Sequence, residues 1–143
     1  MRRAVAFFNL VSMFWVGLFA QGGPNAHTIP IRVSVDRQDH SVSYAIGKNA
    51  KLHITDPRIS SELIALSKVE EGSVFIFLIS NEAPFSELDT INYVVDKYDL
   101  TPARFFICDH RSAQMIELKR DTDELFRWTD HKFPISESPP PDQ

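Results

Sequence analysis

Two short apolar runs constrain the fold of this chain more than any other feature. Residues 73–80 read SVFIFLIS and residues 103–108 read ARFFIC. Both runs are rich in β-branched and aromatic residues and are short, so each predicts a strand that is buried on both faces. Apolar residues at helical spacing lie between them and predict a helix over 85–98. Strand, helix and strand in this order predict a βαβ crossover with parallel strands.

The residues before the first run predict a hairpin and a second helix. Apolar and polar side chains alternate over 31–36 and again over 42–46, which is the period of two half-buried strands. Residues 51–55 continue as a short strand or an extended lead-in. Asp56 fits a helix N-cap and Pro57 fits the first helical position. The helix that follows has one apolar stripe, formed by Ile59, Leu63 and Leu66.

These elements predict an α+β fold: a small mixed β-sheet with two helices packed on one face, in the order ββαβαβ. The globular domain spans 31–133, in which 114–120 pairs back on the last strand and 123–133 is either a helical turn or an extended cover. Residues 23–30 form a linker, and the proline-rich tail at 134–143 has too few apolar groups to pack and is expected to be disordered. The predicted core between helices and sheet contains Phe75, Phe77, Leu88, Ile91 and Phe106.

The N-terminal residues 1–22 predict export from the cytoplasm. Arg2 and Arg3 precede a stretch without charge over 4–20, which is the order of a secretory signal. The length of this stretch lies between that of a signal-peptide core and that of a membrane span, so it is either a cleaved signal peptide or an N-terminal anchor. Either way the domain would be periplasmic or secreted, and residues 4–20 would anchor it to the inner membrane if they were retained.

The charge of the chain argues against a nucleic-acid partner, and its cysteine content argues against an internal disulfide. The chain has 15 basic and 19 acidic residues and a net charge of −4, without a basic cluster of the kind that binds phosphate backbones. We therefore expect no nucleic-acid partner. Cys108 is the only cysteine and cannot form an internal disulfide. Its apolar neighbours predict a buried thiol.

No catalytic or metal-binding motif is apparent, and we predict no cofactor and no enzyme activity. Cys108, Asp109 and His110 are adjacent on one strand, where neighbouring side chains point to opposite faces and cannot form a triad by themselves. The five histidines lack the spacing of metal ligands. The corner at 80–84 has no glycine with which to cradle a phosphate, so it is a structural turn or a surface contact.

The pattern from Ile31 to Asp109 resembles the periplasmic domain of the ExbD/TolR biopolymer-transport family. The resemblance rests on the strands IRVSVDRQ and VFIFLIS, the loop NEAP, and the helix FSELDTINYVVDKYDL before ARFFIC. It implies an envelope protein that acts beside proton-driven motor subunits, with Asn81, Glu82 and Phe85 as the partner contact. The family has a carboxylate in its transmembrane helix, whereas residues 4–20 contain no Asp or Glu. A detached domain of this type is therefore the expected form.

The sequence thus predicts a non-catalytic binding or scaffold module of the cell envelope. Its partner would be an envelope protein or a cell-wall component, bound by pairing with an edge strand of the sheet; a homodimer is a further expected state. The alternative is a small secreted enzyme or inhibitor, with a site near Trp128, Asp130 and His131. In that alternative Trp128 would bind a sugar ring, although a Trp beside polar residues more often covers a core, and Asp130, His131 and a second carboxylate would share one pocket.

Overall fold

The computed structural model describes residues 27–47, 51–68, 72–123 and 125–141. The predicted signal segment at 1–22 and the first half of the predicted linker, 23–26, lie outside the described residues, whereas the rest of that linker leads into the first strand, which begins at Thr28. In chain order the elements are β1 (Thr28–Val35), β2 (Val42–Ile46), β3 (Leu52–His53), α2 (Pro57–Ser67), β4 (Val74–Ser80), α3 (Ser86–Lys97), β5 (Ala103–Asp109), β6 (Gln114–Arg120) and β7 (Phe126–Pro134).

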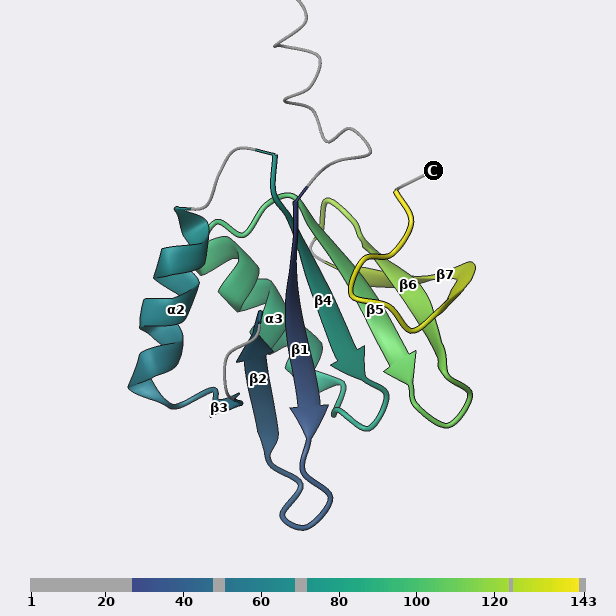
Figure 1. Cartoon of the computed structure of the whole chain (residues 1–143), viewed down its shortest axis with the longest axis horizontal. Helices are drawn as coiled ribbons and strands as arrows, with labels where there is room; N and C mark the ends of the chain where they lie inside the picture. Colours follow the sequence, from purple (N-terminus) through teal and green to yellow (C-terminus); the bar gives the residue numbers. More distant parts are fainter. Residues whose placement is uncertain (1–26, 48–50, 69–71, 124, 142–143) are drawn as a thin grey trace, which may run out of the picture.

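The strands form one mixed sheet of seven strands, in the order β3-β2-β1-β4-β5-β6-β7 (Figure 1). Strands β1, β4 and β5 are mutually parallel, and every other neighbouring pair is antiparallel. The two apolar runs thus form adjacent parallel strands joined by α3, so the predicted crossover is confirmed. The run at 73–80 lies at the centre of the sheet, which explains its continuous apolar character.

The predicted order ββαβαβ is wrong, because the described chain runs βββαβαβββ. The difference lies mainly in β6 and β7, which extend the sheet beyond β5. Their alternation is weak for two physical reasons. A register shift between Ile116 and Leu118 interrupts the pairing of β6 with β7, and the side chains of β7 are mostly exposed. Of the two alternatives for 123–133, the extended one matches the structure.

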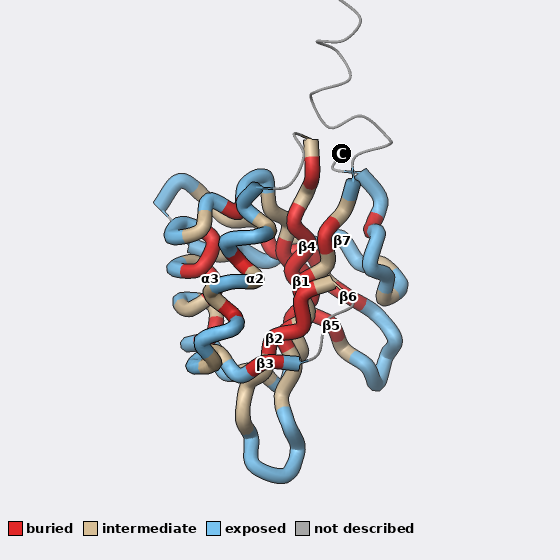
Figure 2. The backbone as a smooth tube through the Cα atoms, turned by 60° about the vertical axis from the view of Figure 1, so that its left-hand side comes forward, coloured by how far each residue is buried: buried red, intermediate tan, exposed pale blue. Residues whose placement is uncertain are grey.

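Both helices lie on one side of the sheet, where the larger part of the core is formed (Figure 2). There Phe77 stacks on Phe105, with ring centroids 5.3 Å apart. Phe105 and Phe126 form an edge-to-face pair with ring centroids 4.9 Å apart. Phe75, Phe77 and Ile91 are buried in this cluster as predicted, and Leu88 is partly buried against it.

A second apolar cluster occupies the opposite side of the sheet. It consists of Ile76, Leu78, Phe106, Cys108 and Met115, all buried. Phe106 is therefore buried, but not between helices and sheet as the sequence predicted. Since Phe105 and Phe106 are neighbours on a strand, their rings point to opposite faces, and the sheet has a core on each side.

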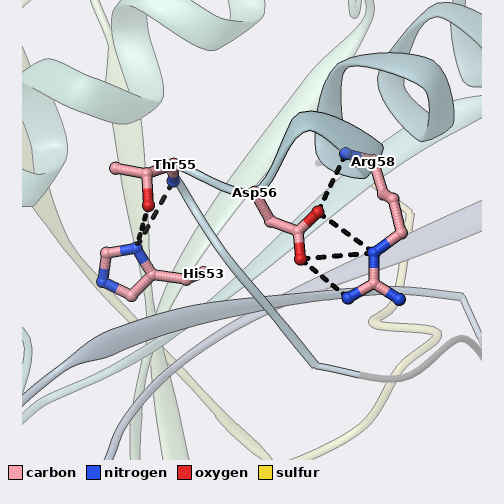
Figure 3. Close-up of polar contacts among 4 residues, drawn as sticks. All are labelled: His53, Thr55, Asp56 and Arg58. Carbon is pink, nitrogen blue, oxygen red and sulfur yellow. Dashed lines mark hydrogen bonds and ion pairs between the residues drawn. The ribbon is translucent and has the colours of Figure 1, made fainter.

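The start of α2 is as the sequence predicted. The Asp56 carboxylate accepts a hydrogen bond from the backbone N–H of Arg58 at 2.9 Å, and Pro57 occupies the first turn. The Arg58 side chain bends back and donates to the same carboxylate, with its Nη2 2.7 Å from Oδ2 (Figure 3). These bonds lower the pKa of Asp56 to about 2. On the adjacent turn, His53 Nδ1 lies 2.8 Å from the Thr55 hydroxyl.

Within the described ranges, neither α2 nor α3 has the length and apolar character that a bilayer crossing would require.

Candidate binding surface

A small hollow lies at the carboxyl ends of the central parallel strands, on the helix side of the sheet. Its floor is formed by Ile79 of β4 and Ile107 of β5, and its walls by Leu88, Pro84, Phe85 and Trp128. Its volume is about 100 Å³, well below the 300–1,000 Å³ of typical small-molecule sites. Such a space accepts a single apolar side chain rather than a metabolite.

The corner between β4 and α3 shapes this hollow through backbone bonds. The N–H of Asn81 donates to the carbonyl of Cys108 at 3.0 Å, which ties the corner to β5. The N–H of Ala83 donates to the Ser80 carbonyl at 3.0 Å and closes a turn. The N-cap position of α3 is Phe85, which makes no side-chain cap bond. Its ring is left on the surface.

A second, shallow depression lies along the exposed side of α3 and shares no lining residue with the small hollow. Three of its lining residues are acidic, and two carry exposed apolar side chains: Asp89, Asn92, Tyr93, Asp96, Lys97, Asp123 and Leu125. Arg120 of β6 binds the Asp96 carboxylate through Nη2 at 2.9 Å and so fixes the helix to the sheet. The Lys97 ammonium lies 5.2 Å from the centre of the Tyr93 ring, which is a cation–π contact.

Exposed large apolar side chains are concentrated on this part of the molecule. Five are found among the described residues, and four of them line the two hollows with exposures of 57–77%: Phe85, Tyr93, Leu125 and Trp128. We call these four residues the α3–β7 surface. The fifth, Ile64 on α2, lines neither hollow. Trp and Tyr are the residue types that most often dominate protein–protein contacts.

The structure brings part of the predicted partner contact to this surface. Asn81 and Phe85 line the small hollow. Glu82 is not among the residues that line it, and its carboxylate lies 3.6 Å from Arg37 in the β1–β2 turn. Trp128, which the sequence assigned to the alternative enzyme or inhibitor site, lines the same hollow as Phe85.

The other members of that alternative site are not gathered around Trp128. Trp128 pairs with Leu118, which belongs to the core on the helix side. His131 instead has its Nδ1 3.8 Å from the buried Glu117, whose partner Arg104 lies over the Phe106 ring on the opposite side. Asp130 is exposed. Trp128 and His131 thus lie on opposite faces of the sheet.

The adjacent residues Cys108, Asp109 and His110 also form no reactive group. Burial of the Cys108 thiol raises its pKa to about 11, which disfavours the thiolate. The Asp109 carboxylate accepts from the backbone N–H of Arg111 at 2.9 Å and stabilises the turn. Over the described ranges, no group of three or more His, Cys, Asp or Glu side chains could hold a metal ion.

Sequence reasoning missed Tyr93 and Leu125. Tyr93 lies outside the apolar stripe of α3, which Ile91, Val94 and Val95 form by their buried side chains. A large apolar residue on the polar side of an amphipathic helix is a usable signal for a contact surface. No comparable signal in the sequence marks Leu125, because its place on this surface depends on the strand β7 that begins at the next residue.

A scan against models of protein families, a search of curated proteins and a search of solved structures each found no match to this chain.

Proposed function

We propose that this chain is a non-catalytic binding module of the cell envelope and that its partner docks on the α3–β7 surface. One observation carries the proposal: four of the five exposed large apolar side chains in the described part of the chain gather around α3 and β7. Clustered exposed aromatic residues beside a side-chain-sized hollow are the usual features of a contact that holds a protein anchor.

The charges around this surface favour a particular kind of partner. Asp89, Asp96 and Asp123 line the depression together with one lysine, Lys97. Asp96 is already paired with Arg120, so Asp89 and Asp123 carry the acidic character. A matching segment would insert an apolar side chain beside Phe85 and Trp128 and place Arg or Lys side chains against the acidic residues. We therefore propose a protein partner with an apolar anchor flanked by basic residues.

Docking of side chains is a better proposal here than pairing with the sheet edge. The edge strand β7 carries Arg127, Asp130 and Lys132 and ends at Pro134. Charged residues and proline on an edge strand oppose the addition of another strand. The opposite edge, β3, is only two residues long.

The experiment is affinity capture from an envelope extract with the tagged chain and two matched variants. Trp128→Ser removes an apolar side chain from the α3–β7 surface, and Ile64→Ser removes one from α2, outside that surface. We expect a protein retained by the wild type and by Ile64→Ser but lost with Trp128→Ser. Equal capture by all three folded proteins would contradict the assignment of this surface.

Placement in the envelope is a separate part of the proposal and depends on residues 1–22. The resemblance to the ExbD/TolR family supports it on pattern alone. N-terminal sequencing of the protein recovered from its host should find a start near Gly23, or an intact N-terminus held in the membrane. Recovery of full-length protein from the cytoplasm in soluble form would overturn it, without bearing on the α3–β7 surface.

A further inference from the structure

The face of the sheet opposite the helices is covered by the chain's own proline-rich segment. Figure 1 shows residues 135–141 (yellow) in front of β5, and Figure 2 shows the segment on the side of the sheet away from α2 and α3. The sequence predicted disorder here, yet Pro139 is buried and Ile135 packs on the second apolar cluster. A short segment thus takes the place that a helix layer has on the other face.

Three polar contacts hold this segment, two from β1 and one from β5. Arg32 of β1 forms an ion pair with Glu137. Thr28, at the start of the same strand, has its hydroxyl 3.3 Å from that of Ser138. Arg104 of β5 donates from Nη1 to the carbonyl of Pro140. The charge contact, the hydroxyl contact and the carbonyl contact thus fall on residues 137, 138 and 140 of the segment.

Arg104 is also held by contacts that do not involve the segment. Its Nε donates to the buried Glu117 carboxylate at 2.9 Å, and its guanidinium lies 5.0 Å from the centre of the Phe106 ring. The residue exposes only 12% of its side chain, yet Nη1 still reaches the segment. Proline has no backbone N–H, so a proline-rich peptide offers mainly carbonyl acceptors. A fixed guanidinium donor above an aromatic ring suits such a peptide.

The two charged-group contacts fall three residues apart, on Glu137 and on the Pro140 carbonyl, and the backbone bends at Glu137 and Ser138 so that both reach the sheet. The face also has a positive balance around the segment, because Arg32, Arg104 and Lys119 accompany the one buried carboxylate of Glu117. The segment that lies on it, Ser-Glu-Ser-Pro-Pro-Pro, is acidic and rich in proline.

We propose that this face of the sheet is a binding site for acidic, proline-rich peptide segments of the form Glu-x-x-Pro, and that residues 136–141 occupy it in cis. A segment of this type from a partner protein binds by displacing the chain's own segment. The proposal is independent of the α3–β7 surface, which lies on the other side of the sheet.

The test uses a fluorescein-labelled synthetic peptide with the sequence of residues 135–143 and a variant that lacks residues 136–143. We expect saturable binding to the truncated variant by fluorescence anisotropy. Binding to the full chain should be weaker by about ten-fold or more, because a tethered segment competes at an effective concentration in the millimolar range. A peptide of the same composition in scrambled order is the control.

Reversal of the ion pair tests the register. Arg32→Glu in the truncated chain should weaken binding of the natural peptide, and a peptide with Glu137→Arg should restore it. If truncation prevents folding, the full chain with Glu137→Gln and Pro139→Ala replaces it as the receptor, since its own segment has lost the ion pair and the buried proline ring.

Three results would overturn the proposal: no saturable binding to either receptor, equal binding of the scrambled peptide, or no effect of the charge reversal in a folded protein. A fourth result that would overturn it is exchange of the segment between two copies of the chain. A full chain that is dimeric in sedimentation equilibrium and becomes monomeric on truncation would assign the site to a second copy rather than to a partner.

Discussion

The phenolic hydroxyl of Tyr44 on β2 donates a hydrogen bond to Oε1 of Glu87 in the first turn of α3. Both residues are buried on the helix side of the sheet. This bond provides the buried carboxylate with a donor and fixes the start of α3, from which Phe85 and Leu88 reach the small hollow.

Removal of this hydroxyl should destabilise the fold measurably. Tyr44→Phe leaves the Glu87 carboxylate buried without its donor, and we expect a loss of about 1.5–3 kcal/mol in the free energy of unfolding by urea titration. Glu87→Gln keeps an acceptor for the hydroxyl and removes the buried charge, so its effect should be smaller. A Tyr44→Phe protein as stable as the wild type would show that the bond contributes nothing.

The same pair predicts a loss of stability at alkaline pH. Burial, followed by the hydrogen bond to Glu87 and the charge of Glu87, raises the pKa of Tyr44 above its usual value of about 10. A raised pKa favours the neutral phenol in the folded state, so this contribution is complete below about pH 10 and falls as the pH rises further. Urea titrations on both sides of this pH should show the fall in the wild type and a smaller one in Tyr44→Phe.

The cap of α2 predicts an effect at the acid end. Hydrogen bonds from Arg58 lower the pKa of Asp56 to about 2, so the stabilisation is complete above about pH 4 and is lost as the pH falls towards 2. The carboxyl carbon of Asp56 should titrate near 2 by NMR. Asp56→Asn keeps the cap acceptor without the charge and should protect the amides of α2 from exchange better than Asp56→Ala. A midpoint near 4 would contradict the bonded geometry.

Cys108 should be chemically silent in the folded protein. Burial raises the pKa of its thiol to about 11, and the thiolate is the reactive form. At pH 8 we expect iodoacetamide to label the folded chain far more slowly than the urea-unfolded chain, as followed by mass spectrometry. Rapid labelling of the folded protein would mean that the second apolar cluster opens readily.

The two faces of the sheet predict two separate cores of comparable importance. Phe77→Ala on the helix side and Phe106→Ala on the other should each cost about 3–5 kcal/mol of unfolding free energy, as is usual when a buried aromatic residue is truncated. Phe85→Ala is the matched control, because its ring is exposed and should change stability by less than about 0.5 kcal/mol. A small loss for Phe106→Ala alone would show that the C-terminal segment does not seal its face.

The parts of the fold that could be read from the sequence are those with local chemical signals. The hairpin of β1 and β2, the Asp56 cap and the buried runs at β4 and β5 each follow from residue type and spacing. The additional strands could not be read in the same way. In β6 the buried Glu117 occupies a position where alternation calls for an apolar residue, and its partners Arg104 and His131 are distant in the sequence.

The candidate site shows the same limit. Phe85 was predicted only through the family resemblance, and Trp128 from its residue type, but as members of two rival sites. Only the pairing of β6 with β7 brings Trp128 to the hollow beside Phe85. That pairing depends on a register shift which no local pattern encodes. The seating of residues 135–141 likewise depends on Arg32 and Arg104, which come from strands far apart along the chain.

The central position of β4 has a consequence for how the chain reaches this structure. The pairs β1–β2 and β5–β6–β7 join strands that are neighbours in sequence, so they close short loops. β4 pairs on both sides with strands that are distant in the chain, since Thr28 lies opposite Val74 and Phe75 lies opposite Ala103. Closing such long loops costs entropy before any burial compensates for it, and mixed sheets of this kind fold more slowly than helical bundles. We expect the rate-limiting barrier to be the insertion of β4 between two preformed antiparallel units, which leaves its apolar run exposed until last.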